Sequence, residues 1–293
     1  MNGILLVDKP AGWTSHDVVA KLRGVLGERR MGHSGTLDPM ATGLLVVFAG
    51  RATRAVSFSE NHTKCYEAHL RLGLTTDTQD TTGTVLSRAE RTVSRAELEA
   101  VLPQFRGDIL QVPPMYSALK VDGKKLYELA REGKTVERKA RTVHFYEIDI
   151  KEINLPYVRF SVTCSKGTYI RTLCHDIGQK LGCGGCMEEL LRSRVGRYSL
   201  FESHTLAQVE AAVADGTVQD MIDPVEAVLA EYPALYADSY GDRLLANGNP
   251  LSDNLVRPQH KEGWVRMYAS DGTFTGIFQW DAGKKKYYPV KMF

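Results

Sequence analysis

Residues 30–48, RMGHSGTLDPMATGLLVVF, join a short polar loop to a buried apolar run. Asp38 lies in the loop between Gly35 and Pro39, where glycine can adopt positive φ and proline fixes its own φ. The Leu-Leu-Val-Val-Phe run that follows Gly43 has the pattern of a fully buried strand. The stretch therefore predicts a lone carboxylate that stiff backbone holds against a rigid strand.

This stretch is compatible with a reactive carboxylate and also with an ordinary turn. Aspartate in a Gly/Pro turn often accepts backbone hydrogen bonds in an Asx-turn, so both interpretations of Asp38 remain open from these residues alone. A phosphate-binding loop is excluded, because Gly-His-Ser-Gly-Thr lacks a Gly-Lys-Ser/Thr ending. Ser34 is not in a Gly-x-Ser-x-Gly sequence, so Asp38 is the candidate for chemistry.

The overall composition is that of a globular chain with a substantial core. With 293 residues and 43% hydrophobic content, the chain can hold one large or two ordinary domains. No apolar run of the sequence approaches the roughly 20 residues of a membrane span. Residues 4–7, stopped by Asp8 and Lys9, are predicted to form a first strand and not a signal peptide.

The five cysteines have no regular spacing, which argues against a disulfide framework. A reducing compartment is therefore predicted, and the expected location is the cytoplasm. Cys183 and Cys186 form a CxxC sequence, but no second pair or nearby pair of histidines completes a tetrahedral ligand set. We interpret this sequence as a Gly-rich turn and predict no metal site.

The net charge of +2 conceals an uneven distribution. Residues 1–200 carry 29 Lys and Arg against 22 Asp and Glu, whereas residues 201–234 carry seven acidic and no basic residues. Residues 235–293 carry eight basic against six acidic residues. The first and last segments therefore suit contact with a polyanion, although a solvated basic surface explains the same counts.

Alternating apolar positions predict the strands around the Asp38 loop. In residues 64–72, Tyr66 and every second residue after it are apolar, which indicates a half-buried strand with Tyr66 on its inner face. Two long strands are predicted at 143–153 and 157–165. A core role explains an inward tyrosine as well as a functional role does.

Residues 170–181 have apolar positions at helical spacing, and Gly182 is the predicted stop of this helix. Arg171 falls in the first turn, where a cation opposes the helix dipole. The position is unfavourable unless an anionic group lies beside it. Such a local inconsistency is typical of functional sites.

Residues 104–141 carry nine basic against five acidic residues. Tyr116, Lys120 and Tyr127 interleave aromatic and basic side chains, a pattern that suits base stacking together with phosphate contact. We expect an inserted arm that closes over a ligand, with a solvated hairpin and helix as the alternative. After Pro233, short strands separated by Asp/Gly turns predict a small separate β-barrel.

Five motifs occur in an order and spacing that resemble the TruB family of tRNA pseudouridine synthases. They are GHSGTLDPMATGLL (32–45), KCYEAHLRLG with TDTQD (64–73 and 76–80), QVPPMYSALKVDGKKLYELAREG (111–133), CSKGTYIRTLCHDIG (164–178) and LLRSRVG (190–196). The resemblance covers roughly residues 2–205. The segment after Pro233 is similar to a PUA-type RNA-binding barrel.

The resemblance implies an α+β fold, with a central mixed, mainly antiparallel sheet flanked by helices. Residues 1–232 are then the pseudouridine synthase catalytic domain, with an insertion at about 104–141. Residues 233–293 are then a PUA-like RNA-binding domain.

The resemblance also implies roles for individual residues. Asp38 corresponds to the catalytic carboxylate, Tyr66 to the aromatic residue that stacks on the target uracil, and Arg171 to the cation that pairs with Asp38. Leu191 is expected to wall the base pocket, and Lys9 and His33 to belong to an RNA-contacting rim. The complete expected substrate-binding set is Lys9, His33, Asp80, Tyr169, Leu191, Lys120 and Lys124.

The implied reaction converts the T-loop uridine at tRNA position 55 to pseudouridine. The expected partner is the T-arm of tRNA, with no membrane, no obligate protein partner, and no metal or organic cofactor. Asp38 is able to attack the base or C1′ of the sugar, or to assist departure of the base, and these routes stay open. The alternatives are a guide-RNA-dependent synthase subunit and a non-catalytic RNA-binding protein or tRNA chaperone on the same scaffold.

Overall fold

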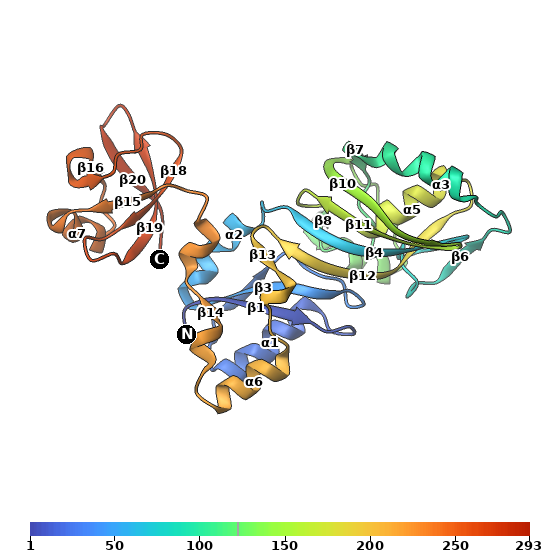
Figure 1. The fold of residues 1–293 in the computed structure, drawn as a ribbon, viewed down its shortest axis with the longest axis horizontal. Helices are drawn as coiled ribbons and strands as arrows, with labels where there is room; N and C mark the ends of the chain where they lie inside the picture. Colours follow the sequence, from blue (N-terminus) through green and yellow to red (C-terminus); the bar gives the residue numbers. More distant parts are fainter. Residues whose placement is uncertain (122) are drawn as a thin grey trace.

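The computed structural model describes residues 1–121 and 123–293 and is elongated (Figure 1). A ten-stranded sheet runs through the larger part of the molecule, and a six-stranded sheet forms a separate lobe near the C-terminus. The main order of the large sheet is β14-β1-β3-β12-β4-β11-β10-β7, with β2 beside β3 and β13 beside β12. Its strands pair antiparallel except for β3 with β12, so the predicted mixed, mainly antiparallel sheet is confirmed.

The larger part of the molecule contains the large sheet and the helices that pack on it. The strands of the large sheet are β1 Gly3–Lys9, β2 Met31–Ser34, β3 Thr42–Ala49, β4 Lys64–Leu72, β7 Gly107–Gln111, β10 Arg141–Asn154, β11 Tyr157–Cys164, β12 Gly185–Val195, β13 Tyr198–Ser199 and β14 Ile222–Asp223. The α-helices of this part are α1 Ser15–Leu26, α2 Val56–Ser59, α3 Arg95–Val101, α4 Leu126–Arg131, α5 Ile170–Lys180 and α6 Leu206–Ala214, whereas α7 Ser239–Ala246 lies in the C-terminal lobe (Figure 1). Two small hairpins, β5 Leu74–Thr76 with β6 Val85–Arg88 and β8 Lys120–Val121 with β9 Lys124–Lys125, lie outside the sheet.

Local sequence explains where the helices begin. Thr14 accepts a hydrogen bond from the backbone of Asp17, whose side chain accepts one in return from the backbone of Thr14. Such a capping box satisfies backbone donors that a helix N-terminus leaves unpaired. The same arrangement starts α3 at Ser94 and α6 at Thr205.

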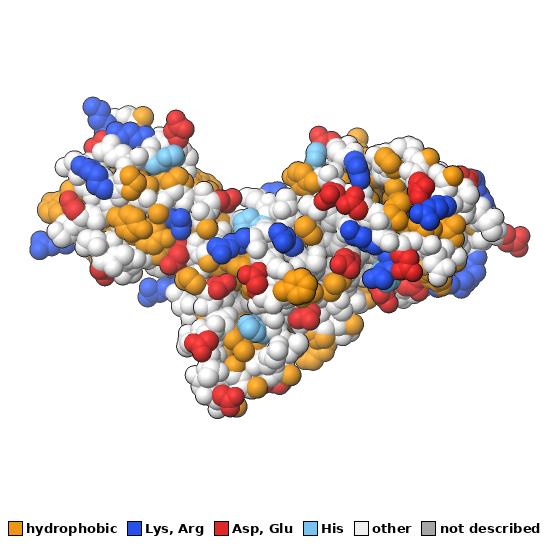
Figure 2. All heavy atoms as spheres, in the orientation of Figure 1, with side chains coloured by type: hydrophobic (Ala, Val, Ile, Leu, Met, Phe, Trp, Pro, Cys, Tyr) orange, Lys and Arg blue, Asp and Glu red, His pale blue; other side chains and the backbone are white. Residues whose placement is uncertain are grey.

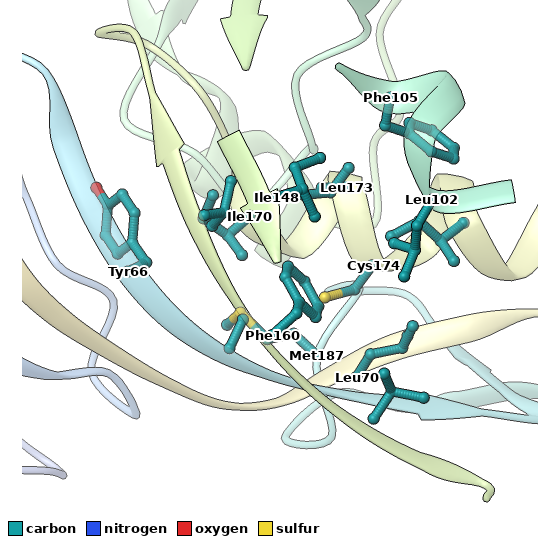
Figure 3. Close-up of a cluster of buried hydrophobic side chains, with 14 of the residues drawn as sticks. Tyr66, Leu70, Leu102, Phe105, Ile148, Phe160, Ile170, Leu173, Cys174 and Met187 are labelled. Carbon is teal, nitrogen blue, oxygen red and sulfur yellow. The ribbon is translucent and has the colours of Figure 1, made fainter. Parts of the chain in front are cut away.

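Helices cover different parts of the large sheet and so divide its core. Val18 and Leu22 of α1 pack with Val209 of α6 against β1 and β3. Farther along the sheet, α5 packs against β4, β10 and β11 through Leu173 and Cys174 (Figure 3). In Figure 3 Tyr66 lies at the margin of this second cluster, which places its ring between the core and the adjacent cavity.

The segment expected to form the arm differs from the prediction at its start. Residues 107–111 form β7, an edge strand paired with β10 in the main sheet, so the part that leaves the sheet is 112–140. This part has a small core of its own, in which Met115 packs with Leu126 and Leu129 of α4. The arm is therefore a folded unit with its own apolar centre.

The C-terminal lobe is a nearly closed β-barrel-like sheet. Its order is β16-β20-β19-β18-β15-β17, with β15 Ala234–Ala237, β16 Leu251–Ser252, β17 Val256–Arg257, β18 Trp264–Tyr268, β19 Phe274–Asp281 and β20 Lys286–Met292. Val265, Phe278 and Tyr287 are fully buried in its own core. The small barrel predicted after Pro233 is confirmed, and Figure 2 shows a hollow between it and the rest of the molecule.

Candidate active site

A cavity of about 690 Å³ opens beside the loop between β2 and β3. The inner faces of β4 and β12, the start of α5 and residues 117–119 of the arm form its other walls. A volume of this size falls within the usual range for ligand pockets. Asp38, Tyr66 and Arg171 all line it, although they are far apart in the sequence.

Asp38 and Arg171 form a bidentate ion pair in this cavity. Nε of Arg171 donates to Oδ2 of Asp38 at 2.9 Å, and Nη2 donates to Oδ1 at 3.1 Å. The Arg171 side chain is 4% exposed, whereas that of Asp38 is 34% exposed. The guanidinium is thus fixed behind the carboxylate, which keeps a face open to the cavity. Arg171 has the anionic partner that its position in the first turn of α5 requires.

Backbone carbonyls fix the rest of the Arg171 guanidinium. Nη1 donates to the carbonyl of Thr78 and Nη2 to the carbonyl of Tyr116, each at 2.8 Å. Arg171 therefore ties the Asp38 loop, the loop after β5 and the arm to α5. Planar, multiply bonded guanidinium groups hold a carboxylate with defined geometry, which a flexible lysine cannot reproduce.

Tyr66 presents its ring to the cavity from the inner face of β4, as the alternation predicted. Burial raises the pKa of Tyr66 to about 12, and Arg192, its cross-strand neighbour, opposes that rise. The hydroxyl is therefore protonated at neutral pH. A buried aromatic ring with a protonated hydroxyl suits stacking on a base together with proton transfer.

Three of the residues predicted to bind substrate, Lys9, Leu191 and Asp80, do not line the cavity. Lys9 is fully buried, and its ammonium donates to the carbonyls of Pro10, Trp13 and Pro39 at 2.8, 2.6 and 3.2 Å. It therefore fastens the base of the Asp38 loop and does not belong to a rim that RNA can reach. The reason is that the chain brings these three carbonyls together around the end of β1, and one of them comes from Pro39, thirty positions further along the sequence.

The wall of the cavity contains Leu190 and not Leu191. Leu190 and Arg192 lie on one face of β12 and both line the cavity, whereas Leu191 points the other way and pairs beside Thr42 of β3. Residues two apart on a strand share a face. Alternation back from Arg192 therefore identifies Leu190 as the residue that sequence analysis missed.

Asp80 supports the site from behind and does not line the cavity. Its carboxylate accepts hydrogen bonds from the Thr78 hydroxyl at 2.8 Å and the Thr82 backbone at 3.0 Å. Its other oxygen lies 3.7 Å from Nη1 of Arg171. Asp80 therefore holds the loop of residues 77–82, whose Thr78 carbonyl accepts from Arg171.

The other predicted substrate-binding residues fall into two groups. His33 and Tyr169 line the cavity. Burial, followed by the charge of Arg192, lowers the pKa of His33 to about 4, so its imidazole is neutral at pH 7. Lys120 and Lys124 are exposed on the β8–β9 hairpin of the arm, outside the cavity wall.

In residues 1–121 and 123–293, no group of three or more His, Cys, Asp or Glu side chains has the arrangement of a metal site. Cys183 and Cys186 are free, buried thiols, and burial raises the pKa of Cys186 to about 11. Among the described helices, none has both the length and the apolar character needed to cross a membrane.

Comparisons with known proteins agree with this fold. Residues 23–170 match the model of the TruB family pseudouridylate synthase N-terminal domain, and residues 171–230 match that of the tRNA pseudouridylate synthase B C-terminal domain. The matches place the chain among the pseudouridylate synthases. Within that class, the chain belongs to the TruB family.

Relatives match over nearly the whole chain. The tRNA pseudouridine synthase B of Clostridium novyi is 44% identical over 94% of this chain and 95% of its own length. That of Lachnoclostridium phytofermentans is 45% identical over the full length of both. Among solved structures, a Cbf5-Nop10-Gar1 complex contains a chain that aligns with a TM-score of 0.76 at 26% identity, over 99% of this chain and 84% of its own.

Proposed function

We propose that this enzyme isomerises a uridine of tRNA to pseudouridine, and that its target is position 55 in the T-loop. The observation that carries the proposal is the bidentate Asp38–Arg171 pair in a cavity whose sheet wall presents Tyr66 and Leu190. Relatives that match at 44% and 45% identity are tRNA pseudouridine synthase B proteins, which supports tRNA as the substrate.

The chemistry explains why these groups belong together. The N1–C1′ bond of the uridine breaks, the base turns, and a C5–C1′ bond forms; C5 then loses a proton and N1 gains one. Atoms and electrons balance within the nucleotide, so this isomerisation requires no electron or group donor. We assign Asp38 as the carboxylate that acts on the base or on C1′, since both routes need an ionised, positioned carboxylate.

Arg171 and Tyr66 take complementary roles in this proposal. Arg171 stabilises the negative charge of Asp38 through two hydrogen bonds and holds the carboxylate in a defined position beside the nucleotide. Tyr66 holds the detached base by stacking, and its hydroxyl is the candidate to move the C5 proton. Leu190 completes the apolar wall on which the base turns.

The target uridine must leave its folded loop before it can reach Asp38, at a cost of a few kcal/mol. Contacts with the rest of the tRNA have to offset this cost. We propose that Lys120 and Lys124 of the arm contact phosphates of the T-arm.

We further propose that residues 1–232 form the catalytic domain and 233–293 an RNA-binding domain. The five free cysteines suit the reducing cytoplasm as the place of action.

The test uses the purified full-length chain and a tRNA transcript labelled with tritium at C5 of uridine. Isomerisation at position 55 releases tritium to water, and a transcript with cytidine at that position releases none. Equal release from the two transcripts contradicts the assigned position. No release from either one, at any enzyme concentration, favours a guide-RNA-dependent subunit or a non-catalytic RNA-binding protein.

A further inference from the structure

Two buried cations line the cavity without a carboxylate partner. The Lys64 side chain donates to the carbonyls of Glu60 and His62 at 2.8 and 2.7 Å. Arg192 donates from Nε to the carbonyl of Leu44 at 2.7 Å and from Nη2 to that of Gly35 at 3.0 Å. Lys64 is 6% exposed and Arg192 is 1% exposed. Within the described residues, neither has a carboxylate oxygen within 4.0 Å, although buried charges are usually paired.

These cations lie next to the surface assigned to the base. Lys64 precedes Tyr66 by two residues on the inner face of β4, and Arg192 is the cross-strand neighbour of Tyr66 on β12. Two strand residues correspond to about 7 Å. One nucleotide can span this distance, so a nucleotide whose base rests on Tyr66 and Leu190 brings its backbone toward Lys64 and Arg192.

The charge balance of the cavity wall points to an anionic ligand. Five cationic side chains line it, which are Lys64, Arg141, Lys166, Arg171 and Arg192, against the carboxylates of Asp38 and Glu60. Asp38 is already engaged by Arg171, which leaves four cations and one exposed carboxylate.

Lys64 and Arg192 also disfavour each other's charge. Burial first, and then the charge of Arg192, lowers the pKa of Lys64 to about 8. The Lys64 ammonium has three protons and makes two hydrogen bonds among the described residues, so it can donate a third to a ligand. An anion bound between the two side chains accepts from the Lys64 ammonium and offsets the repulsion between the two cations.

We propose that Lys64 and Arg192 form a binding site for a phosphodiester phosphate that flanks the extruded uridine. The site holds the nucleotide by its backbone while the base detaches and turns on Tyr66 and Leu190. This inference rests on the proposed function, because it takes the ligand to be an RNA nucleotide. The arrangement explains why two buried cations are left unpaired in the free protein.

The test uses a T-arm hairpin RNA in which one phosphodiester is replaced by an uncharged methylphosphonate. Three hairpins carry it on the 5′ side of the target uridine, on the 3′ side, or in the distal stem. With the wild-type chain, one flanking replacement is expected to lower kcat/KM by at least about tenfold, since hydrogen bonds between charged groups are among the strong ones. The distal replacement is expected to change it less than about twofold, because it removes only a long-range, screened charge.

Variants of Lys64 and Arg192 then test whether these two side chains bind the flanking phosphate. In Lys64→Met, the loss of kcat/KM caused by the flanking methylphosphonate is expected to shrink to less than about twofold. The reason is that this variant lacks the positive charge that binds the phosphate in the wild type. The exposed Lys151 provides the matched control, and Lys151→Met is expected to retain the full penalty. Arg192→Gln, which keeps side-chain donors, provides a second variant if Lys64→Met does not fold, and its penalty is expected to shrink in the same way.

The outcomes separate this inference from the function on which it rests. If the wild-type chain does not convert the unmodified hairpin but converts whole tRNA, the methylphosphonates are placed in tRNA instead; if it converts neither, the proposed function fails. If it converts the substrate and neither flanking replacement exceeds the distal one, the phosphate site is overturned. An undiminished penalty in both folded variants also overturns it.

Discussion

The two sides of the cavity differ in whether their cationic side chains are paired with a carboxylate. On one side Arg171 meets Asp38 through two hydrogen bonds, and carbonyls from two further loops fix the same guanidinium. On the other side Lys64 and Arg192 donate to neutral backbone carbonyls, and neither has a carboxylate partner among the described residues. The first side is therefore complete before substrate arrives, whereas the second has positive charge left for a ligand. A preorganised pair suits chemistry, and an unpaired cation suits recognition.

Among the variants that keep Asp38, the largest loss of activity is expected from Arg171. Arg171→Met leaves Asp38 without its counter-charge and removes the donors to the Thr78 and Tyr116 carbonyls. We expect kcat/KM on tRNA to fall by about a thousandfold, measured by tritium release. Arg171→Lys restores the charge without the bidentate geometry, so its activity is expected to fall between the two. If Arg171→Met folds and retains activity within tenfold of the wild type, the pair is not essential.

A smaller loss of turnover is expected when the Tyr66 hydroxyl is removed. Tyr66→Phe keeps the ring but removes the group assigned to proton transfer, so kcat is expected to fall by about a hundredfold with little change in KM. Tyr198 is also a buried tyrosine, but it lies outside the cavity wall, and Tyr198→Phe is the matched control. Equal turnover in the Tyr66→Phe variant and the control contradicts the assignment.

A stability effect is expected at Lys9. Lys9→Met removes three hydrogen bonds that the ammonium donates to backbone carbonyls, so the free energy of unfolding is expected to fall by about 2 kcal/mol in a urea titration. Affinity for tRNA is expected to change less than about twofold, because Lys9 is fully buried. If a stable Lys9→Met variant loses much of its affinity for tRNA, the prediction is wrong and Lys9 contacts the RNA. Lys151→Met provides the exposed control.

The smallest effect is a pH dependence on the unpaired side. The pKa of Lys64 is lowered to about 8, so the side chain is charged below pH 8 and loses its proton as the pH rises through that value. RNA binding by the wild type is therefore expected to weaken between pH 7 and 9, by about threefold more than binding by Lys64→Met. The measurement is the Kd of the T-arm hairpin across this range. Parallel profiles for the two proteins show that Lys64 does not meet a phosphate.

Sequence patterns predict the paired side of the cavity better than the unpaired side. The apolar strand after Gly43 locates the Asp38 loop, and alternation places Tyr66 on the inner face of β4. The unfavourable place of Arg171 in a helix N-terminus requires an anion nearby, and the structure supplies Asp38. These inferences succeed because each depends on local periodicity or local electrostatics.

The missed features depend on contacts between distant segments. Pro39 lies thirty positions after Lys9, so no local pattern shows that its carbonyl helps to bury that ammonium. The register of β12 has irregularities on both sides of Leu190, which weakens a prediction of its inward face from sequence alone. Lys64, by contrast, carries a usable signal, because it shares a strand face with Tyr66.

The most direct measurement compares binding and turnover in Asp38→Asn. This substitution keeps the shape of the side chain and removes its charge, so the proposed carboxylate chemistry predicts tRNA affinity within about threefold of the wild type and turnover reduced by about ten-thousandfold. Tritium release from C5-labelled tRNA gives the turnover, and filter binding gives the Kd. A variant that binds tRNA and turns over at a rate near that of the wild type contradicts the account.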